Sequence, residues 1–222
     1  MEGDEVRLQG GIKEKLLRIK EMWAREGRLL TGTTGDPGRD RLPPGQRLVQ
    51  DFPVLDLGVQ PEVPEAAAKL RLDGLVEAPA VLDWAALQAL PRATVRNDIH
   101  CVTQWSRYDN DWEGVAVETL IEHVRPKEEA HFVSLESHDG YTTNLRFADF
   151  ARPGNVVAFR WNGEPLTREH GGPMRLVVPH LYLWKSPKWL RRIEFLADNR
   201  PGFWEVRGYH DRGDPWNEER YG

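Results

Sequence analysis

Short stretches that alternate in polarity or are apolar, each cut off by glycine, proline or asparagine, make up most of this chain of 222 residues. Residues 155–161 alternate and run into Asn162-Gly163, a pair typical of a tight β-hairpin turn. Residues 70–76 and 130–135 also have the pattern of strands. Helical stretches are few and short, at residues 82–90, 117–124 and 147–150. Asp83 is placed to cap the first of these helices. The mixture predicts an α+β fold built on a mixed, loop-rich sheet.

The first 41 residues are predicted to form an arm in front of the main domain. Residues 5–30 carry apolar side chains at helical spacing, with Gly27 placed to end the helix. We favour an amphipathic helix packed on the body of the protein. A helix lying on a membrane surface is less favoured, because glutamates dilute its basic face. Turn-forming residues 31–47 follow, and the compact domain is predicted over residues 42–222.

Composition excludes several classes of protein. With 30 Lys plus Arg against 35 Asp plus Glu, the chain lacks the basic character of a nucleic-acid-binding domain. A single cysteine excludes an intramolecular disulfide, an iron–sulfur cluster and a C-x-x-C-H haem attachment. No apolar run is long enough for a transmembrane helix, and no secretory signal is visible. We therefore expect a cytoplasmic protein without a membrane span, monomeric by default.

The only cysteine, Cys101, stands near the middle of the chain at the end of a predicted strand. Trp105 follows it closely, and the aromatic-rich segment after that, residues 107–112, is predicted to be a loop. Loops held by a rigid scaffold commonly carry reactive groups. A lone cysteine in a soluble protein is nevertheless more often a small buried hydrophobe than a ligand or nucleophile. The interpretation of Cys101 therefore depends on the rest of the chain.

A second candidate region lies between residues 162 and 189. His170 is followed by Gly171-Gly172, which lets an extended ligand approach the backbone beside an imidazole. Further on, Lys185, Ser186 and Lys188 share a proline-containing loop, a composition suited to binding a phosphate. The alternative is a structural corner with an ordinary solvated basic face. The usual nucleotide-binding glycine motifs are absent, and zinc-ligand spacing is not found around Cys101.

Several residues stand at fixed spacing in the second half of the chain, with Cys101 upstream: Asn162-Gly163, Pro165-Leu166, His170-Gly171, Pro173, Arg175, Val178-Pro179 and Lys188-Trp189. Through these positions, residues 42–222 resemble the molybdopterin-binding domain of the sulfite oxidase family. Three longer runs are similar to short cytoplasmic bacterial sulfite oxidase-like oxidoreductases: residues 98–106, 179–189 and 208–221.

The resemblance implies a cofactor, molybdenum bound to molybdopterin in its monophosphate form, and a role for particular residues. Cys101 falls on the position of the thiolate ligand of molybdenum, which agrees with the preference of such metals for soft ligands. His170 and Arg175 fall on positions that contact the pterin. The remaining implied cofactor contacts are Val49, Gln50, Asp51, Phe52, Glu136 or Ser137, and the phosphate loop of Lys185, Ser186, Pro187 and Lys188.

The implied activity is a two-electron oxygen-atom transfer or the reduction of a small substrate. Besides Cys101, the side chains of Trp105, Arg107 and Tyr108 are expected at the reacting end of the pocket. Sulfite-oxidising members carry Arg-Asn-His where this chain has residues 50–52 as Gln-Asp-Phe, and sulfite is a dianion best bound by arginines. The departure argues against sulfite and favours an S-oxide or N-oxide.

Two further expectations concern partners and the C-terminal tail. Because no haem or iron–sulfur motif is present, electrons would be exchanged with an external partner. The aromatic tail, residues 202–221, has two open roles: packing over the core, or roofing the site with Tyr209 or His210 near the metal. The alternative function is a non-catalytic or degenerate module that binds molybdopterin or another phosphorylated ligand.

Overall fold

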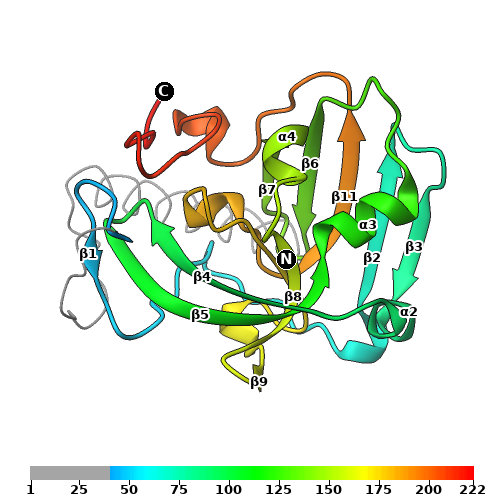
Figure 1. Ribbon diagram of the computed structural model, residues 1–222, viewed down its shortest axis with the longest axis horizontal. Coiled ribbons are helices and arrows are strands. Elements are labelled where there is room, and N and C mark those ends of the chain that lie inside the picture. The colour runs from blue at the N-terminus through cyan, green and yellow to red at the C-terminus, as the bar shows by residue number, and fades with distance from the viewer. Residues whose placement is uncertain (1–40) are drawn as a thin grey trace, which may run out of the picture.

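Two β-sheets and three short α-helices make up residues 41–222, the part of the chain that the computed structural model describes (Figure 1). The helix predicted over residues 5–30 and most of the predicted linker lie outside the described residues. Both sheets contain parallel and antiparallel pairs, and helices are few. The predicted α+β mixed-sheet fold is therefore confirmed.

The first sheet is organised around the long strand β5, which pairs with three neighbours. It lies parallel to β1 and antiparallel to β4 and β8, and β8 in turn pairs with β9 and β10. The strands are β1 (Arg47–Leu48), β4 (Ala93–Cys101), β5 (Trp105–Ala116), β8 (Val156–Trp161), β9 (Glu164–Pro165) and β10 (Arg175–Val177). The hairpin predicted at Asn162-Gly163 is confirmed, since both residues have positive φ and join β8 to β9.

The second sheet brings together strands that are distant in the sequence. Its order is β3-β2-β11-β6-β7, with β2 and β11 parallel and the other pairs antiparallel. The strands are β2 (Lys69–Gly74), β3 (Ala80–Asp83), β6 (Phe132–Ser137), β7 (Thr142–Arg146) and β11 (Leu190–Leu196). The loop that precedes β11, residues 183–189, contacts both β7 and the C-terminal tail, since Lys185 donates to Asn144 and lies 2.7 Å from Glu205.

The helices follow the sequence closely because their signals are local. They are α2 (Trp84–Ala89), α3 (Val117–Val124) and α4 (Phe147–Phe150), with 3₁₀ turns at η2 (Glu65–Ala67), η3 (Arg168–His170), η4 (Leu183–Lys185) and η5 (Glu205–Arg207). Asp83 caps α2 as predicted, its carboxylate accepting from the Ala86 N–H at 2.8 Å.

Two main hydrophobic clusters fill the molecule. The larger is aliphatic and includes Leu72, Leu135 and Ile193 of the second sheet, all fully buried. The second is aromatic and surrounds Cys101, with Trp105 and Trp112 nearly or fully buried. Burial of such side chains contributes about 1.5–3 kcal/mol each. The aromatic cluster therefore holds the segment that carries the cysteine in a fixed position.

One prediction was wrong: the aromatic-rich segment at residues 107–112 is not a loop but lies within β5. The chain reverses in a tight turn at residues 101–104, where Gln104 has a φ of 67°. Pairing with β4 then satisfies the backbone of the segment, and Trp112 is buried while Asp109 is exposed. Cross-strand pairing decided the conformation, and single residues such as Asp109 and Asn110 carry no signal for it.

Candidate functional site

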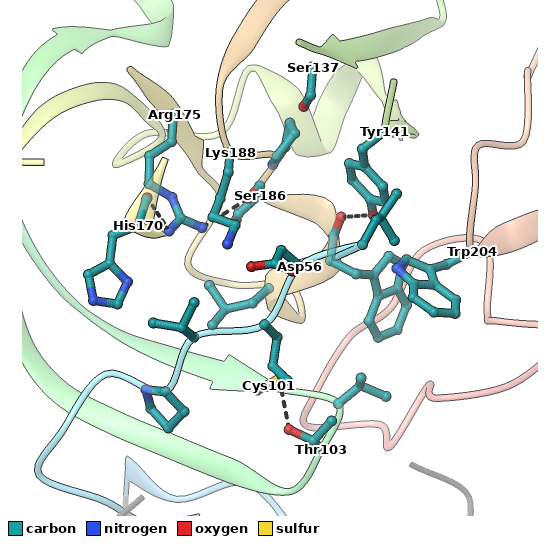
Figure 2. Close-up of a pocket in the computed structure, with 18 of the residues that line it drawn as sticks. Asp56, Cys101, Thr103, Ser137, Tyr141, His170, Arg175, Ser186, Lys188 and Trp204 are labelled. Carbon is teal, nitrogen blue, oxygen red and sulfur yellow. Dashed lines mark hydrogen bonds between the residues drawn. The ribbon is translucent and has the colours of Figure 1, made fainter. Parts of the chain in front are cut away.

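A cavity lies beside the Cys101 side chain (Figure 2). Its walls come from segments far apart in the sequence: residues 52–57, the turn after β4, the turn between β6 and β7, His170 and Arg175, the loop 183–189, and the tail. Segments that form one cavity in this way are brought together only by the tertiary fold. The cavity is the candidate site.

Many of the residues singled out in the sequence line this cavity. They are Phe52, Cys101, Trp105, Ser137, His170, Arg175, Ser186, Pro187 and Lys188. Seven others do not line it: Val49, Gln50, Asp51, Arg107, Tyr108, Glu136 and Lys185. Val49 is buried in the aromatic cluster, and its N–H donates to the Ser106 carbonyl at 2.9 Å.

The side chains of Arg107 and Tyr108 are engaged elsewhere. Arg107 donates to the Gln50 carbonyl at 3.1 Å and lies over the Trp161 ring, 4.7 Å from its centroid. Tyr108 lies under the guanidinium of Arg41, at 4.3 Å. The structure therefore gives both residues supporting positions outside the cavity.

Two charged residues of the predicted cofactor set are paired with other side chains. Glu136 of β6 accepts from Arg192 of the neighbouring strand β11 at 2.9 Å. Lys185 is fully buried, and its ammonium lies 2.7 Å from Glu205 Oε1 and donates to Asn144. Burial lowers the pKa of Lys185 despite the adjacent carboxylate. Lys185 thus connects the phosphate-type loop to the tail.

The Cys101 thiol is nearly buried, with 6% of the residue exposed. The Thr103 hydroxyl donates a hydrogen bond to Sγ at 3.1 Å, across the turn (Figure 2). Burial raises the pKa of the thiol, while the Thr103 contact opposes that effect. A metal ion would displace the thiol proton, because a coordinating cysteine is a thiolate.

Arg175 joins the two loops of the opposite wall. The residue is 3% exposed, and its guanidinium donates to the carbonyls of His170 and Ser186, both at 3.0 Å. Burial lowers its pKa to about 10, so it remains cationic at neutral pH. The His170 ring stacks on Phe52 at 4.2 Å, and burial with the nearby Arg175 lowers the pKa of His170 to about 4. His170 is therefore a neutral imidazole that can donate one hydrogen bond and accept another.

Three buried polar atoms on the cavity wall have no hydrogen-bond partner within the described residues. They are Trp105 Nε1, Ser137 Oγ and Arg175 Nε. An unpaired buried donor costs about 1–3 kcal/mol, so such atoms are rare without a reason. A ligand rich in acceptor atoms would satisfy them. A molybdenum-bound pterin, with its ring nitrogens, carbonyl and phosphate oxygens, fits this set together with the Cys101 thiol.

Lys188 supplies positive charge at the cavity. Its ammonium donates to the Glu169 carbonyl at 2.8 Å and points into the cavity, as does the Asp56 carboxylate (Figure 2). Gly171 makes this arrangement feasible. A Cβ on Gly171 would stand 2.8 Å from the Cβ of Lys188, and its φ of 101° favours glycine.

The C-terminal tail supplies a wall of the cavity and also packs against the aromatic cluster. Tyr209 and Trp204 line the cavity, with ring centroids 4.8 Å apart, and Trp184 packs edge-on against Tyr209. His210 does not line the cavity, and its Nδ1 lies 3.3 Å from Glu219 instead.

Some cavity residues were missed in the sequence, notably Asp56, Asp139, Tyr141, Trp184 and Trp204. Asp139 has a local signal, since its carboxylate accepts from the Tyr141 N–H in a turn. Asp56 has a similar one, since its carboxylate accepts from the Gly58 N–H at 2.7 Å. Tyr141 and Trp184 have none, because they meet across more than forty positions, where the Tyr141 hydroxyl donates to the Trp184 carbonyl at 2.5 Å.

The sequence matches the family model of the oxidoreductase molybdopterin binding domain over residues 57–204, which is more than half of the chain. The chain belongs to this family. It is thus a molybdopterin-dependent oxidoreductase of the sulfite oxidase type, and the expectation of an enzyme is confirmed.

Relatives of the molybdopterin-binding family extend the match. The uncharacterized oxidoreductase YuiH of Bacillus subtilis is 49% identical over 182 residues, 82% of this chain and 92% of its own length. The protein-methionine-sulfoxide reductase catalytic subunit of Gluconobacter oxydans is 30% identical over 61% of this chain and 49% of its own length. The chain thus spans nearly all of the first relative and about half of the second.

A solved structure shows the same family fold. The sulfane dehydrogenase SoxCD of Paracoccus pantotrophus superposes with a TM-score of 0.58 and 25% sequence identity, over 63% of this chain and 40% of that chain. Within residues 41–222, no helix combines the length and apolar character needed to cross a bilayer.

Proposed function

We propose that this oxidoreductase binds molybdenum–molybdopterin in the cavity, with the Cys101 thiolate as the protein ligand of the metal, and reduces a small neutral S-oxide or N-oxide. The observation that carries the proposal is the meeting of a buried thiol with three unpartnered buried polar atoms in one cavity. The family membership makes the pterin the natural occupant.

The residues around the cavity would divide the work of holding the cofactor. Arg175 and His170 would contact the pterin, Ser137 would offer its hydroxyl, and the loop ending at Lys188 would hold the phosphate. The bound metal would supply two-electron redox chemistry and a site for an oxygen atom. The protein would supply one soft ligand, a fixed orientation and an aromatic lining.

The lining near Cys101 favours a neutral substrate. Trp184, Trp204 and Tyr209 form an aromatic wall, and Arg107, the one arginine expected there, points elsewhere. A dianion such as sulfite would lack a bidentate partner at this end. A sulfoxide or amine oxide would instead present its apolar groups to the aromatic wall. The relative named as a methionine-sulfoxide reductase supports an S-oxide.

Metal and pterin analysis of the Lys188→Ala variant tests the proposal. The wild-type protein, expressed with molybdate, should contain about one molybdenum and one pterin per chain. Loss of Lys188 should lower the retained pterin on the order of tenfold, since a charge-assisted hydrogen bond is worth about 1.5–3 kcal/mol. Arg125→Ala, which removes an exposed cation paired with Glu77, is the matched control and should retain the cofactor.

The Thr103 hydrogen bond should tune the metal centre. Donation to a thiolate sulfur withdraws charge and raises the reduction potential of the bound metal. Thr103→Val should therefore lower the molybdenum midpoint potential, measured by a redox titration followed by electron paramagnetic resonance. Thr103→Ser retains the donor and should restore the wild-type value. An unchanged potential in the valine variant contradicts Thr103 as a tuning residue.

The alternative is a module that binds molybdopterin or another phosphorylated ligand without turnover. Pterin bound at full occupancy with no molybdenum, and no reaction of the reduced protein with any S-oxide or N-oxide, would favour it. An external electron partner, a cytoplasmic location, a monomeric state and the boundary at residue 42 complete the proposal as predictions from the sequence.

A further inference from the structure

The strand β4 presents Cys101 and the preceding residue, His100, to different pockets. Successive side chains of a strand point to opposite faces. Cys101 lines the cavity described above, and His100 lines a second pocket of about 330 Å³. His100, which lines the second pocket, is thus joined by one peptide bond to Cys101, the proposed metal ligand.

Trp216 and His100 form an aromatic pair between the surface of this second pocket and β4. Trp216 of the tail is 49% exposed, and its ring centroid lies 6.3 Å from that of His100. His100 is 4% exposed and is held by Ser106, whose Oγ lies 2.8 Å from its Nδ1. The backbone N–H of Trp216 donates to Asp214 at 2.9 Å. The His100 ring is therefore fixed, and the backbone that carries the exposed indole is anchored next to it.

The tail brings Trp216 to this place through its contacts with the turn after β4. Arg220 donates to the Val102 carbonyl at 3.0 Å, and Figure 1 shows the tail in red above the end of β4. The Tyr182 N–H donates to the Gly213 carbonyl at 2.8 Å. The same segment thus lines the catalytic cavity with Tyr209 and the second pocket with Trp216.

The charges of the second pocket leave one cation uncompensated. Arg41 is paired with Asp98 and also lies 2.9 Å from Asp109. His180 Nε2 lies 3.3 Å from Asp149, which Arg212 also binds. Arg152 also lines the pocket and is exposed, and within residues 41–222 its guanidinium has no hydrogen bond or ion pair.

We propose that the second pocket binds a small planar redox carrier that bears an anionic group, and that electrons pass between this carrier and the metal centre through Trp216 and His100. The indole would stack on the planar ring, and Arg152 would bind the anion. The volume is that of a small-molecule site. The charges around it alternate in sign, which argues against a protein partner that docks by one sign of charge.

The inference rests on the proposed function, and its chemistry balances. The reduced carrier gives up two electrons and two protons and becomes oxidised. At the catalytic cavity an S-oxide takes up two electrons and two protons, its S–O bond breaks, and the oxygen leaves as water. No further oxidant or reductant is needed.

Binding is tested with flavin mononucleotide as the probe, titrated onto the holoenzyme and followed by the quenching of flavin fluorescence. Trp216→Leu and Arg152→Ala should each raise the Kd on the order of tenfold, the loss expected for one stacked ring or one charge-assisted contact. Trp216→Phe keeps a ring and should bind nearly as wild type. The control Arg125→Ala should not change the Kd. No binding by wild-type protein, or equal binding by all variants, overturns the proposal.

Electron transfer is tested by mixing reduced flavin mononucleotide with oxidised holoenzyme in a stopped-flow spectrometer. At saturating flavin, metal reduction should be at least tenfold slower in Trp216→Leu than in wild type, and equal rates would overturn the route. Re-oxidation of dithionite-reduced enzyme by a sulfoxide should be the same in both. Failure of that second reaction in wild type counts against the proposed function alone, because flavin binding and metal reduction are measured without substrate.

Discussion

Replacement of Cys101 by serine should abolish molybdenum binding and turnover while leaving the fold intact. A serine hydroxyl is a poor substitute for a soft thiolate ligand, and loss of outer contacts alone costs metal sites 10–100-fold, so the loss here should exceed about 100-fold. The fold should survive because serine is close in size to cysteine, and Thr103 can donate to the new oxygen as it does to Sγ. Molybdenum content and sulfoxide reduction are the measurements.

Two further observations make the Cys101→Ser result decisive. The urea midpoint should stay close to that of wild type, since a buried hydroxyl with a partner costs less than about 2 kcal/mol. Thr103→Ser should keep both metal and activity, which separates the thiol from its neighbour. A Cys101→Ser enzyme that retained turnover would refute the thiolate as metal ligand and return Cys101 to the role of a core residue.

Replacement of Lys185 by methionine should destabilise the protein by about 3–5 kcal/mol, the cost of leaving a buried charge unpaired. The side chains of Lys185 and Glu205 are 0% and 2% exposed, and their charged atoms lie 2.7 Å apart. Glu205 also accepts from Trp184 Nε1 at 3.0 Å and from the Thr143 hydroxyl at 2.9 Å. Chemical unfolding followed by tryptophan fluorescence measures the loss.

The double variant Lys185→Met/Glu205→Gln should recover most of that stability, because no unpaired charge remains and the glutamine oxygen can still accept from Trp184. Arg125→Ala, which breaks an exposed pair with Glu77, should change the free energy of unfolding by less than about 1 kcal/mol. A Lys185→Met loss no larger than this control would show that the buried pair does not hold the tail. Lys185→Met can also be tested for pterin retention. If this variant retains less pterin and the double variant regains it, the buried pair of Lys185 and Glu205 supports the cavity wall at Trp204, the residue before Glu205.

Elements with local signals were predicted well from the sequence. The helix at residues 117–124 begins and ends as expected because its buried face repeats at helical spacing: Val117, Leu120 and Val124. The turn at Asn162-Gly163 likewise needs only its own residues. The segment after Cys101 was misjudged because its conformation depends on β4, and no property of residues 107–112 indicates that pairing.

In the candidate site, too, residues in a local motif were predicted well and residues that depend on distant contacts were not. His170, Arg175 and Lys188 lie within nineteen positions of one another in a dense motif, and the structure places all three on the cavity. Arg107 was expected there because it follows Cys101 closely, but the hairpin directs its side chain to the Gln50 carbonyl. Lys185 was expected with its neighbours in the loop, but the fold brings Glu205 to it. Closeness in the sequence therefore does not predict the direction in which a side chain points.

The sequence by itself determined the family, the mixed-sheet class and the motif residues of the site, because these depend on residue types at fixed spacing. Only the tertiary structure decided that Trp204 and Tyr209 form a wall of the cavity and that Trp216 meets His100. These contacts join residues separated by about one hundred positions. They exist because the buried Glu205 is held by Lys185 and because Arg220 binds the turn after β4, and neither contact leaves a pattern in the local sequence.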